Sequence, residues 1–390
     1  MNLWKGISKA VDSEKGEMLR LLGELIAQDT ANPPGNEWKA AKVVEKFFQE
    51  NRISYKTFEK EKGRANIIGY IGKGRPRIII ACHLDVVPAG SGWKTNPFKM
   101  VVKGGKAYGR GANDDKGPTA SVLIAGKILK RFEKNLHGQV ILACVADEER
   151  GSKYGLHYLL KTGKINGEYG IVPDVANRMR KIDVAEKGLL HLKITSFGKQ
   201  AHGSRPQKGV NAIWNMVDFL NLLRKYRMKF RKHPLLSDPT VNLGLIKGGS
   251  AANIVPGECE VLLDFRYVPS VKGKDIIKDM KSLLRKVREK NRKARFRLEV
   301  VDDQKPVEIE RKNILIKAIK KNAKKVIGKE PGVFGLSGTT LVKPLARKGI
   351  LAVGFSPGDD AAHIANEYVS IRELLDFSKI LCGVCLDMLT

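Results

Sequence analysis

The chain has few cysteines and lacks any long hydrophobic run. Its five cysteines in 390 residues are an odd number, which argues against a disulfide framework. Residues 1–15 lack the continuous apolar segment of a signal peptide, and no stretch reaches the roughly 20 apolar residues that span a bilayer. We therefore expect a cytoplasmic protein that does not enter the membrane.

The motif Cys382-x-x-Cys385 has the spacing of half a zinc or redox site. The sequence contains no second pair of this kind, and apolar residues surround the motif. Cysteine is among the most frequently buried residue types. We expect both side chains to lie in the core.

Acidic residues are scarce relative to basic ones. Lys and Arg number 71 against 41 Asp and Glu, so the formal net charge is +30. Such a charge attracts anionic partners and substrates. The basic residues are dispersed along helix-like stretches such as 281–297, and no recognisable binding module accompanies them. Nucleic acid is therefore not the expected main partner.

The length and the hydrophobic pattern predict two domains. Strands expected at 65–71, 77–83 and 139–146 alternate with helices, which indicates an α/β sheet. Residues 187–302 follow a β-α-β-β-α-β order, which is the ferredoxin-like α+β motif. The α/β pattern then resumes, so we expect residues 1–186 and 303–390 to form one discontinuous domain.

Side chains of the kind that bind metal ions follow the predicted strands. His83 and Asp85 close one apolar run, and Glu148 and Glu149 close another. The carboxyl ends of strands are where ligands bind in open α/β sheets. Two metal ions held there could activate water against an amide bond. Taken singly, His-x-Asp also suits a loop cap, and the paired glutamates also suit a solvated charge cluster.

The Gly-rich segment 109–117 carries two further carboxylates. Its glycines permit unusual backbone torsions close to a ligand. Asp114 could bridge two cations with its two oxygens, and Asp115 could instead cap the helix that follows. Of the pair Glu148 and Glu149, one can bind metal while the other takes a proton from the bound water.

Together these segments resemble the M20 family of metallopeptidases and amidohydrolases, which includes acetylornithine deacetylase, succinyl-diaminopimelate desuccinylase and several dipeptidases. The resemblance runs in order along nearly the whole chain. It rests on His83-Leu84-Asp85-Val86-Val87-Pro88, Tyr108-Gly109-Arg110-Gly111-Ala112-x-Asp114-Asp115-Lys116-Gly117, Asp147-Glu148-Glu149, Ala201-His202-Gly203-Ser204, Asn253-Ile254-Val255-Pro256, Asp264-x-Arg266 and the His363 segment. It implies a zinc-peptidase-like α/β catalytic domain with the ferredoxin-like unit inserted as a lid and dimerisation domain.

The resemblance also implies a set of metal ligands for two zinc ions per chain, which Co²⁺ or Mn²⁺ could replace. One ion would be held by His83, Asp114 and Asp174, and the other by Asp114, Glu149 and His363. Asp174 follows an apolar run where some family members have Glu, and Glu168 or Asp183 are its alternatives.

Catalytic roles follow from the same resemblance. Glu148 would be the general base, and Asp85 would orient the imidazole of His83. His202 would stabilise the oxyanion, often in the partner subunit's site. The peptide bond between Asp114 and Asp115 would be cis.

Substrate-binding residues are expected in and near the inserted domain. Arg266 and Asn253 match residues that grip the substrate's carboxylate. The loop Ser337, Gly338 and Thr339 corresponds to a substrate-recognition loop, but it lacks the Asp that many members carry there.

We expect a two-metal hydrolase that cleaves an amide bond in a small substrate bearing a carboxylate. The substrate would be an N-acyl amino acid or a short peptide, and the enzyme would be a homodimer joined through the inserted domain. The alternative is a non-catalytic or nucleic-acid-associated basic protein on the same fold, whose binding would weaken steeply with salt.

Overall fold

The computed structural model describes residues 3–390, and the chain divides into two compact units. The first unit runs to Val184 and resumes at Ile309–Phe334 and Thr340–Thr390. The second unit comprises Ala185–Glu308 and Gly335–Thr339. The sequence placed the inserted segment at 187–302. The short loop 335–339, which lies far along the sequence, also belongs to the second unit.

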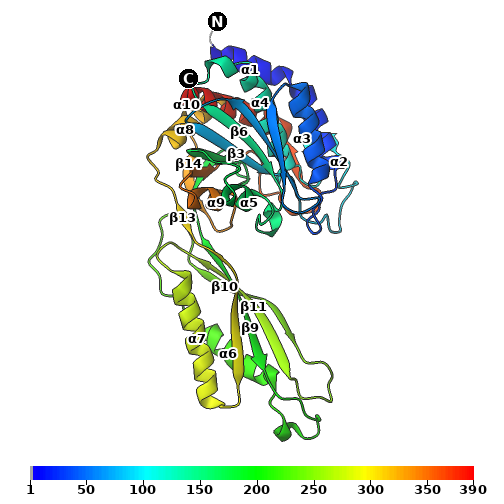
Figure 1. Cartoon of the computed structure of the whole chain (residues 1–390), viewed down its shortest axis with the longest axis vertical. Helices are drawn as coiled ribbons and strands as arrows, with labels where there is room; N and C mark the ends of the chain where they lie inside the picture. Colours follow the sequence, from blue (N-terminus) through cyan, green and yellow to red (C-terminus); the bar gives the residue numbers. More distant parts are fainter. Residues whose placement is uncertain (1–2) are drawn as a thin grey trace. The chain divides into compact units, whose positions relative to one another are not determined.

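The first unit is built on a large mixed β-sheet (Figure 1). The strand order is β1-β2-β6-β3-β7-β15-β8-β13, and β14 also pairs with β8. These strands are β1 (Ser54–Glu59), β2 (Ala65–Gly72), β3 (Arg77–His83), β6 (Gln139–Val145), β7 (Tyr169–Val172), β8 (Lys181–Glu186), β13 (Val307–Glu308), β14 (Gly332–Leu336) and β15 (Leu351–Gly354). A small separate sheet contains β4 (Val101–Lys103), β5 (Lys106–Tyr108) and β16 (Tyr368–Ser370).

Helices cover the large sheet. Helix α4 contacts β2, β3 and β6, and helices α1, α2 and α10 pack against α4 (Figure 1). Helices α5 and α9 contact each other, and α9 contacts β7 and β15. The helices are α1 (Leu3–Ser13), α2 (Lys15–Ala27), α3 (Trp38–Glu50), α4 (Lys116–Lys130), α5 (Leu156–Lys161), α8 (Ile314–Ile327), α9 (Val342–Arg347) and α10 (Ile371–Leu389), with short 3-10 turns η1 (Glu133–Asn135) and η2 (Glu148–Arg150).

The centre of the sheet explains where a site can form. Strands β6, β3, β7 and β15 are neighbours and run parallel to one another. Almost all residues of these strands are buried, because helices cover the sheet. Their sequences are therefore continuous apolar runs. The carboxyl ends of these four strands meet at one edge, which is the usual place for a ligand in such sheets.

The second unit is a four-stranded antiparallel sheet with two helices. Its strand order is β10-β11-β9-β12, and its chain order is β-α-β-β-α-β, as the sequence predicted. The elements are β9 (Gly188–Phe197), η3 (Pro206–Lys208), α6 (Ala212–Lys225), β10 (Thr240–Gly248), β11 (Glu258–Tyr267), α7 (Gly273–Lys290) and β12 (Arg295–Gln304). Both helices pack into one apolar core with the sheet.

Helix α6 has clear boundaries at both ends. Asn211 forms its N-cap, because its side-chain oxygen accepts the backbone N–H groups of Ile213 and Trp214 at 2.9 and 3.2 Å. Tyr226 is extended and ends the helix.

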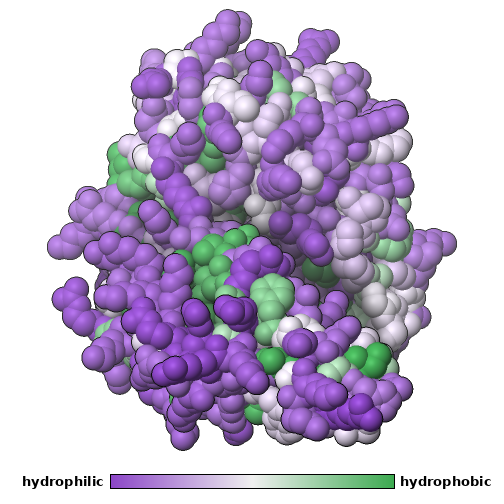
Figure 2. All heavy atoms as spheres, turned by 60° about the horizontal axis from the view of Figure 1, so that its bottom comes forward, coloured by the Kyte–Doolittle hydropathy of each residue, from purple (hydrophilic) through white to green (hydrophobic). Residues whose placement is uncertain are grey.

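The five cysteines are buried and unpaired, and Cys382 and Cys385 lie in the core along α10, as the sequence indicated. Hydrophilic residues predominate on the face drawn in Figure 2, in keeping with the many Lys and Arg residues. Among residues 3–390, none of the helices is both long enough and apolar enough to cross a membrane.

Candidate metal centre

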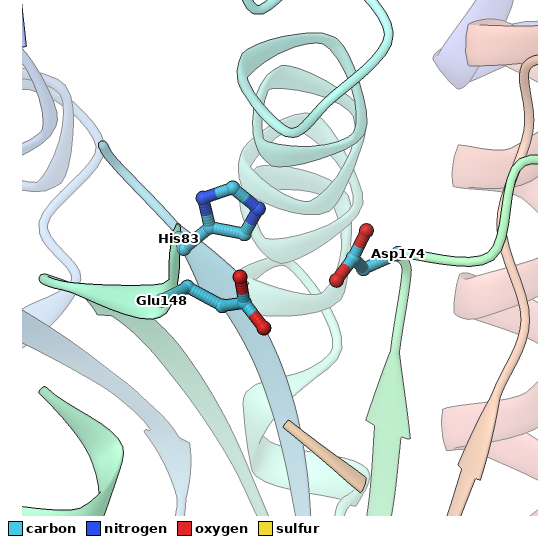
Figure 3. Close-up of side chains that lie close together, drawn as sticks. All are labelled: His83, Glu148 and Asp174. Atoms are coloured by element: carbon cyan, nitrogen blue, oxygen red, sulfur yellow. The ribbon is translucent and has the colours of Figure 1, made fainter. Parts of the chain in front are cut away.

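The predicted metal ligands of the first unit come together at the carboxyl edge of its sheet. His83 ends β3, Glu148 and Glu149 follow β6, and Asp174 follows β7. Ligand atoms of His83, Glu148 and Asp174 all lie within 4.8 Å of one another, and so do those of His83, Asp114 and Glu149. Figure 3 shows His83, Glu148 and Asp174 pointing toward a common space from three neighbouring segments.

Asp114 stands between the two histidines. Its Oδ1 lies 2.9 Å from Nε2 of His83, and its Oδ2 lies 3.1 Å from Nε2 of His363. Nε2 of His363 is also 3.3 Å from Oε2 of Glu149. One carboxylate oxygen therefore faces each imidazole, which is the arrangement that a bridging ligand requires. The Asp114–Asp115 peptide bond is cis, as the resemblance implied.

The turn after β6 presents the two glutamates. Asp147 adopts a left-handed conformation with φ of 65°, so the chain turns sharply and Glu148 opens η2. The backbone N–H groups of Glu148 and Glu149 donate to the two carboxylate oxygens of Asp85 at 3.0 and 3.1 Å. Asp85 thus fixes both glutamates from the end of the neighbouring strand.

Asp85 also contacts His83, though mainly through its backbone. Nδ1 of His83 lies 3.0 Å from the carbonyl oxygen of Asp85 and 3.5 Å from its Oδ1. The sequence predicted that the carboxylate orients the imidazole. In the structure that carboxylate also accepts Nδ2–H of Asn32 at 2.8 Å and the N–H groups of the glutamate turn, and the nearer carbonyl can accept the Nδ1 proton, which leaves Nε2 free to bind metal.

Two buried ion pairs support the glutamate turn and the loop that carries Asp114. The sequence analysis did not predict either pair. Glu37 accepts two bonds from Arg64, and its Oε1 also accepts the N–H of Asp147 at 3.1 Å. Arg110 donates to Glu367, whose carboxylate holds the Asp114 loop. Charged side chains are rarely fully buried unless they are paired, but a sequence does not show which ones are buried.

The crowded carboxylates shift one another's pKa. Burial raises the pKa of Glu148 and of Asp174 well above the ordinary values, and neighbouring carboxylates raise them further. Burial alone would lower the pKa of His83, but bonds to Asp114 and Asp85 outweigh it and raise that pKa well above its usual value. Bonds to Asp114 and Glu149 raise the pKa of His363 to about 10.

These donors fit metal ions. Imidazole nitrogens and carboxylate oxygens are the ligands that zinc takes in catalytic sites. Oε1 of Glu149 is buried and has no hydrogen-bond partner among residues 3–390, so it offers an unused acceptor. A cation would also offset the repulsion among the carboxylates, which burial otherwise makes costly.

The residues predicted for substrate contact lie in the second unit. The His202 turn lies beside the Asn253 turn, because the N–H of Gly203 donates to the carbonyl of Asn253 at 2.7 Å. The imidazole of His202 is exposed, and its Nδ1 is 2.8 Å from Oγ of Ser204. Arg266 pairs through Nε and Nη2 with Asp264 at 2.9 and 3.1 Å.

The loop of Ser337, Gly338 and Thr339 also belongs to the second unit. Oγ of Ser337 lies 3.1 Å from Oγ of Ser237. The alternatives to Asp174 lie elsewhere: Oε2 of Glu168 accepts the N–H of Arg77 at the start of β3, and Asp183 lies within β8. Neither belongs to the ligand clusters found among the described residues.

The comparisons with known proteins define the class. Residues 79–387 match the model of peptidase family M20/M25/M40, so the chain belongs to this family. Membership of this family, together with the fold, identifies the protein as a metal-dependent hydrolase that cleaves amide bonds. An uncharacterised metallohydrolase of Methanocaldococcus jannaschii is 30% identical, with 93% of this chain and 97% of the relative aligned.

Two further relatives differ in their named activities. A probable succinyl-diaminopimelate desuccinylase of Staphylococcus aureus is 28% identical over 94% of this chain and 96% of its own. An M20 family metallo-carboxypeptidase from Sulfolobus solfataricus has a similar fold, with a TM-score of 0.77 and 24% identity over 95% of this chain and 99% of its own. The similarity is therefore shared between deacylase-type and peptidase-type proteins.

Metal binding should strengthen as the pH rises. Metal-binding imidazoles must be neutral, but the raised pKa values of His83 and His363 favour their protonated forms in the metal-free protein. Zinc must displace these protons, so we expect its affinity to rise about tenfold per pH unit for each proton released. Calorimetric titrations at two pH values, in buffers of different ionisation enthalpy, would count the protons. A pH-independent affinity would contradict this prediction.

Proposed function

We propose that the protein is a two-metal hydrolase that cleaves the amide bond of a small carboxylate-bearing substrate, either an N-acyl amino acid or a short peptide. The observation that carries this proposal is the position of Asp114, whose two oxygens face His83 and His363. His83, Asp114 and Asp174 would hold one ion, and Asp114, Glu149 and His363 would hold the other. Zinc fits these donors, and cobalt and manganese are possible substitutes.

When bound, the ions would polarise the scissile carbonyl of the substrate and lower the pKa of the attacking water. Glu148 would accept the proton of that water and later deliver it to the leaving nitrogen. Burial and the neighbouring carboxylates raise the pKa of Glu148 in the metal-free protein, which favours proton uptake by this carboxylate. Asp85 would keep Glu148 and Glu149 in place through their backbone N–H groups.

Glu148 also lies in a ligand cluster with His83 and Asp174. It could therefore bind metal, and Glu149 could be the base. Bonds between side chains favour the assignment made here, because Glu149 is the glutamate that contacts His363, and Oε1 of Glu149 has an unused acceptor position.

Residues of the second unit would bind the substrate and complete catalysis. We propose that His202 stabilises the oxyanion, and that Arg266 and Asn253 bind the substrate's carboxylate. Ser337, Gly338 and Thr339 would add hydroxyl and backbone N–H donors. Since Arg266 is paired with Asp264, part of its hydrogen-bonding capacity is already used.

The second unit would also join two copies of the chain. Strand β10 lies at the edge of its sheet and exposes Val241, Leu243 and Ile246. An uncovered edge strand with apolar side chains is a surface on which another chain can pair, and two-fold dimers are the commonest oligomers. We propose a homodimer, which light scattering of the purified protein would test.

Metal analysis and a substrate screen test the function. Protein purified without chelator should contain up to two zinc or cobalt ions per chain, and chelation should abolish hydrolysis until metal is added back. The screen would contain dipeptides, N-acetyl-amino acids and N-succinyl-amino acids, which separates peptidase from deacylase activity. No bound metal, and no activity after zinc, cobalt or manganese is added, would refute the proposal.

The basic surface supports one other function, which is binding to nucleic acid without catalysis. The net charge of +30 favours it, but charge attracts any polyanion regardless of sequence. Tight binding that falls steeply with salt, together with an absence of hydrolysis, would favour this alternative.

A further inference from the structure

The carboxylate of Glu367 is fully buried and accepts four hydrogen bonds. Oε1 accepts the backbone N–H groups of Asn113 and Asp114 at 2.8 and 3.0 Å. Oε2 accepts the N–H of Gly111 at 3.0 Å and Nη1 of Arg110 at 2.6 Å. A single side chain therefore accepts three backbone N–H groups of the loop that ends at Asp114, those of Gly111, Asn113 and Asp114.

Glu367 comes from the same short segment as His363. The carbonyl oxygen of Glu367 accepts the N–H of Gly109 at 3.0 Å. Glu367 is therefore bonded to both ends of the glycine-rich loop, Gly109 and Asp114. These two segments lie about 250 positions apart in the sequence. Asp114 and His363 meet through side chains at 3.1 Å, and Glu367 joins the backbones that carry them.

Arg110 extends this connection to a third segment. Its Nη2 donates to the carbonyl of Ala89 at 3.1 Å, and its guanidinium lies over the ring of Trp93 at 5.2 Å. Residues 88–94 follow the strand end that carries His83 and Asp85. The side chain of Arg110 is almost fully buried, so these bonds are shielded from competing water.

We propose that the buried Arg110–Glu367 pair is a clamp that sets the position of Asp114 relative to His363, and that it thereby controls metal affinity at the cluster of Asp114, Glu149 and His363. Both are positioning residues, since neither side chain belongs to the ligand clusters. The ion held by His83, Asp114 and Asp174 depends less on the clamp, because two of its three ligands, His83 and Asp174, are placed by the ends of β3 and β7. This inference rests on the proposed two-metal function.

The test is the Glu367→Gln variant, which keeps the size of the side chain but replaces an acceptor with an NH₂ donor. If Oε1 is kept, that NH₂ group faces the donors of Gly111 and Arg110, and their buried hydrogen bonds are lost. Stepwise zinc affinities would be measured by competition with a chromophoric chelator. We expect one of the two zinc affinities to fall by about 10–100-fold, the usual effect of losing a partner of a metal ligand.

Reference variants identify which ion is affected. His363→Ala should weaken the same binding step as Glu367→Gln, while Asp174→Asn should weaken the other step. Arg110→Lys retains the charge but loses the planar fork, so it should weaken the same step as Glu367→Gln and provides a second test if that variant does not fold. Glu14→Gln is the control, because Glu14 is likewise an ion-paired glutamate, with Lys127 and Arg131 as partners, but contacts none of the ligand loops.

Equal loss of both ions, or unchanged zinc affinities in variants that fold, would overturn the clamp. Thermal unfolding of the metal-free proteins separates a general loss of stability from a specific loss of metal. If the wild-type protein bound no zinc, the proposed two-metal function itself would fail. If it bound two ions and Glu367→Gln did the same with equal affinity, only the clamp would be refuted.

Discussion

Glu148→Gln should lower kcat by about 10²–10⁴-fold, the usual contribution of general-base catalysis, while the metal content stays near that of wild type. Glutamine has nearly the same size but cannot accept the proton of the attacking water. The backbone N–H of residue 148 would still donate to Asp85, so the turn should keep its position. Steady-state kinetics and metal analysis of the same preparation would measure both quantities.

Glu149→Gln is the matched variant, because it changes the adjacent carboxylate in the same turn. It should reduce the occupancy of one metal ion, since Oε2 of Glu149 lies next to His363 and its Oε1 is an unused acceptor. If Glu148→Gln lost metal and Glu149→Gln retained it, the roles of the two glutamates would be reversed. Such a reversal would agree with the cluster that contains His83, Glu148 and Asp174.

His202→Ala should lower kcat by about 10²–10³-fold without releasing metal, as expected for the loss of one oxyanion donor. The imidazole belongs to the second unit and is not among the metal-type clusters of the described residues. Its exposed side chain is held by Ser204, so alanine should not disturb the core of its unit. Circular dichroism and metal analysis would check that the variant is folded and loaded.

Mixing two inactive variants would test whether His202 acts across a dimer. If it serves the partner's site, combining His202→Ala with Glu148→Gln should restore part of the activity, because one of the two sites in a mixed dimer has both residues intact. Mixing His202→Ala with wild type provides the control for subunit exchange. Confirmed exchange without recovery would place His202 in the site of its own chain or outside the reaction.

Much of the first unit's site was predictable because strand and ligand signals coincide in the sequence. His83 directly follows an apolar run and Glu148 lies one residue beyond another, and buried parallel strands have such continuous apolar sequences. The sequence pattern therefore predicted that the carboxyl ends of β3 and β6 lie at the same edge of the sheet. Asp174 follows only the four-residue strand β7, which is why its alternatives could not be separated by pattern alone.

The supporting network was not predictable in the same way. Glu367 lies in Ala365-Asn366-Glu367-Tyr368, which resembles a solvated loop, and nothing local indicates that its carboxylate is buried under four donors. Arg110 stood inside a recognised motif, but its partner lies 257 residues away. Pairing over such a distance is decided by tertiary structure and leaves no local signal in a single sequence.

The position of β15 has a consequence for when the proposed metal centre could form during synthesis. This strand lies between β7 and β8 in the sheet, although it comes after the whole second unit in the chain. A nascent chain leaving the ribosome would contain His83, Asp114, Glu148, Glu149 and Asp174 long before it contained β15 and His363. The sheet would still lack an inner strand at that stage, and Asp114 would lack Glu367. Translation order would therefore delay the proposed metal centre until the last tenth or so of the polypeptide has emerged.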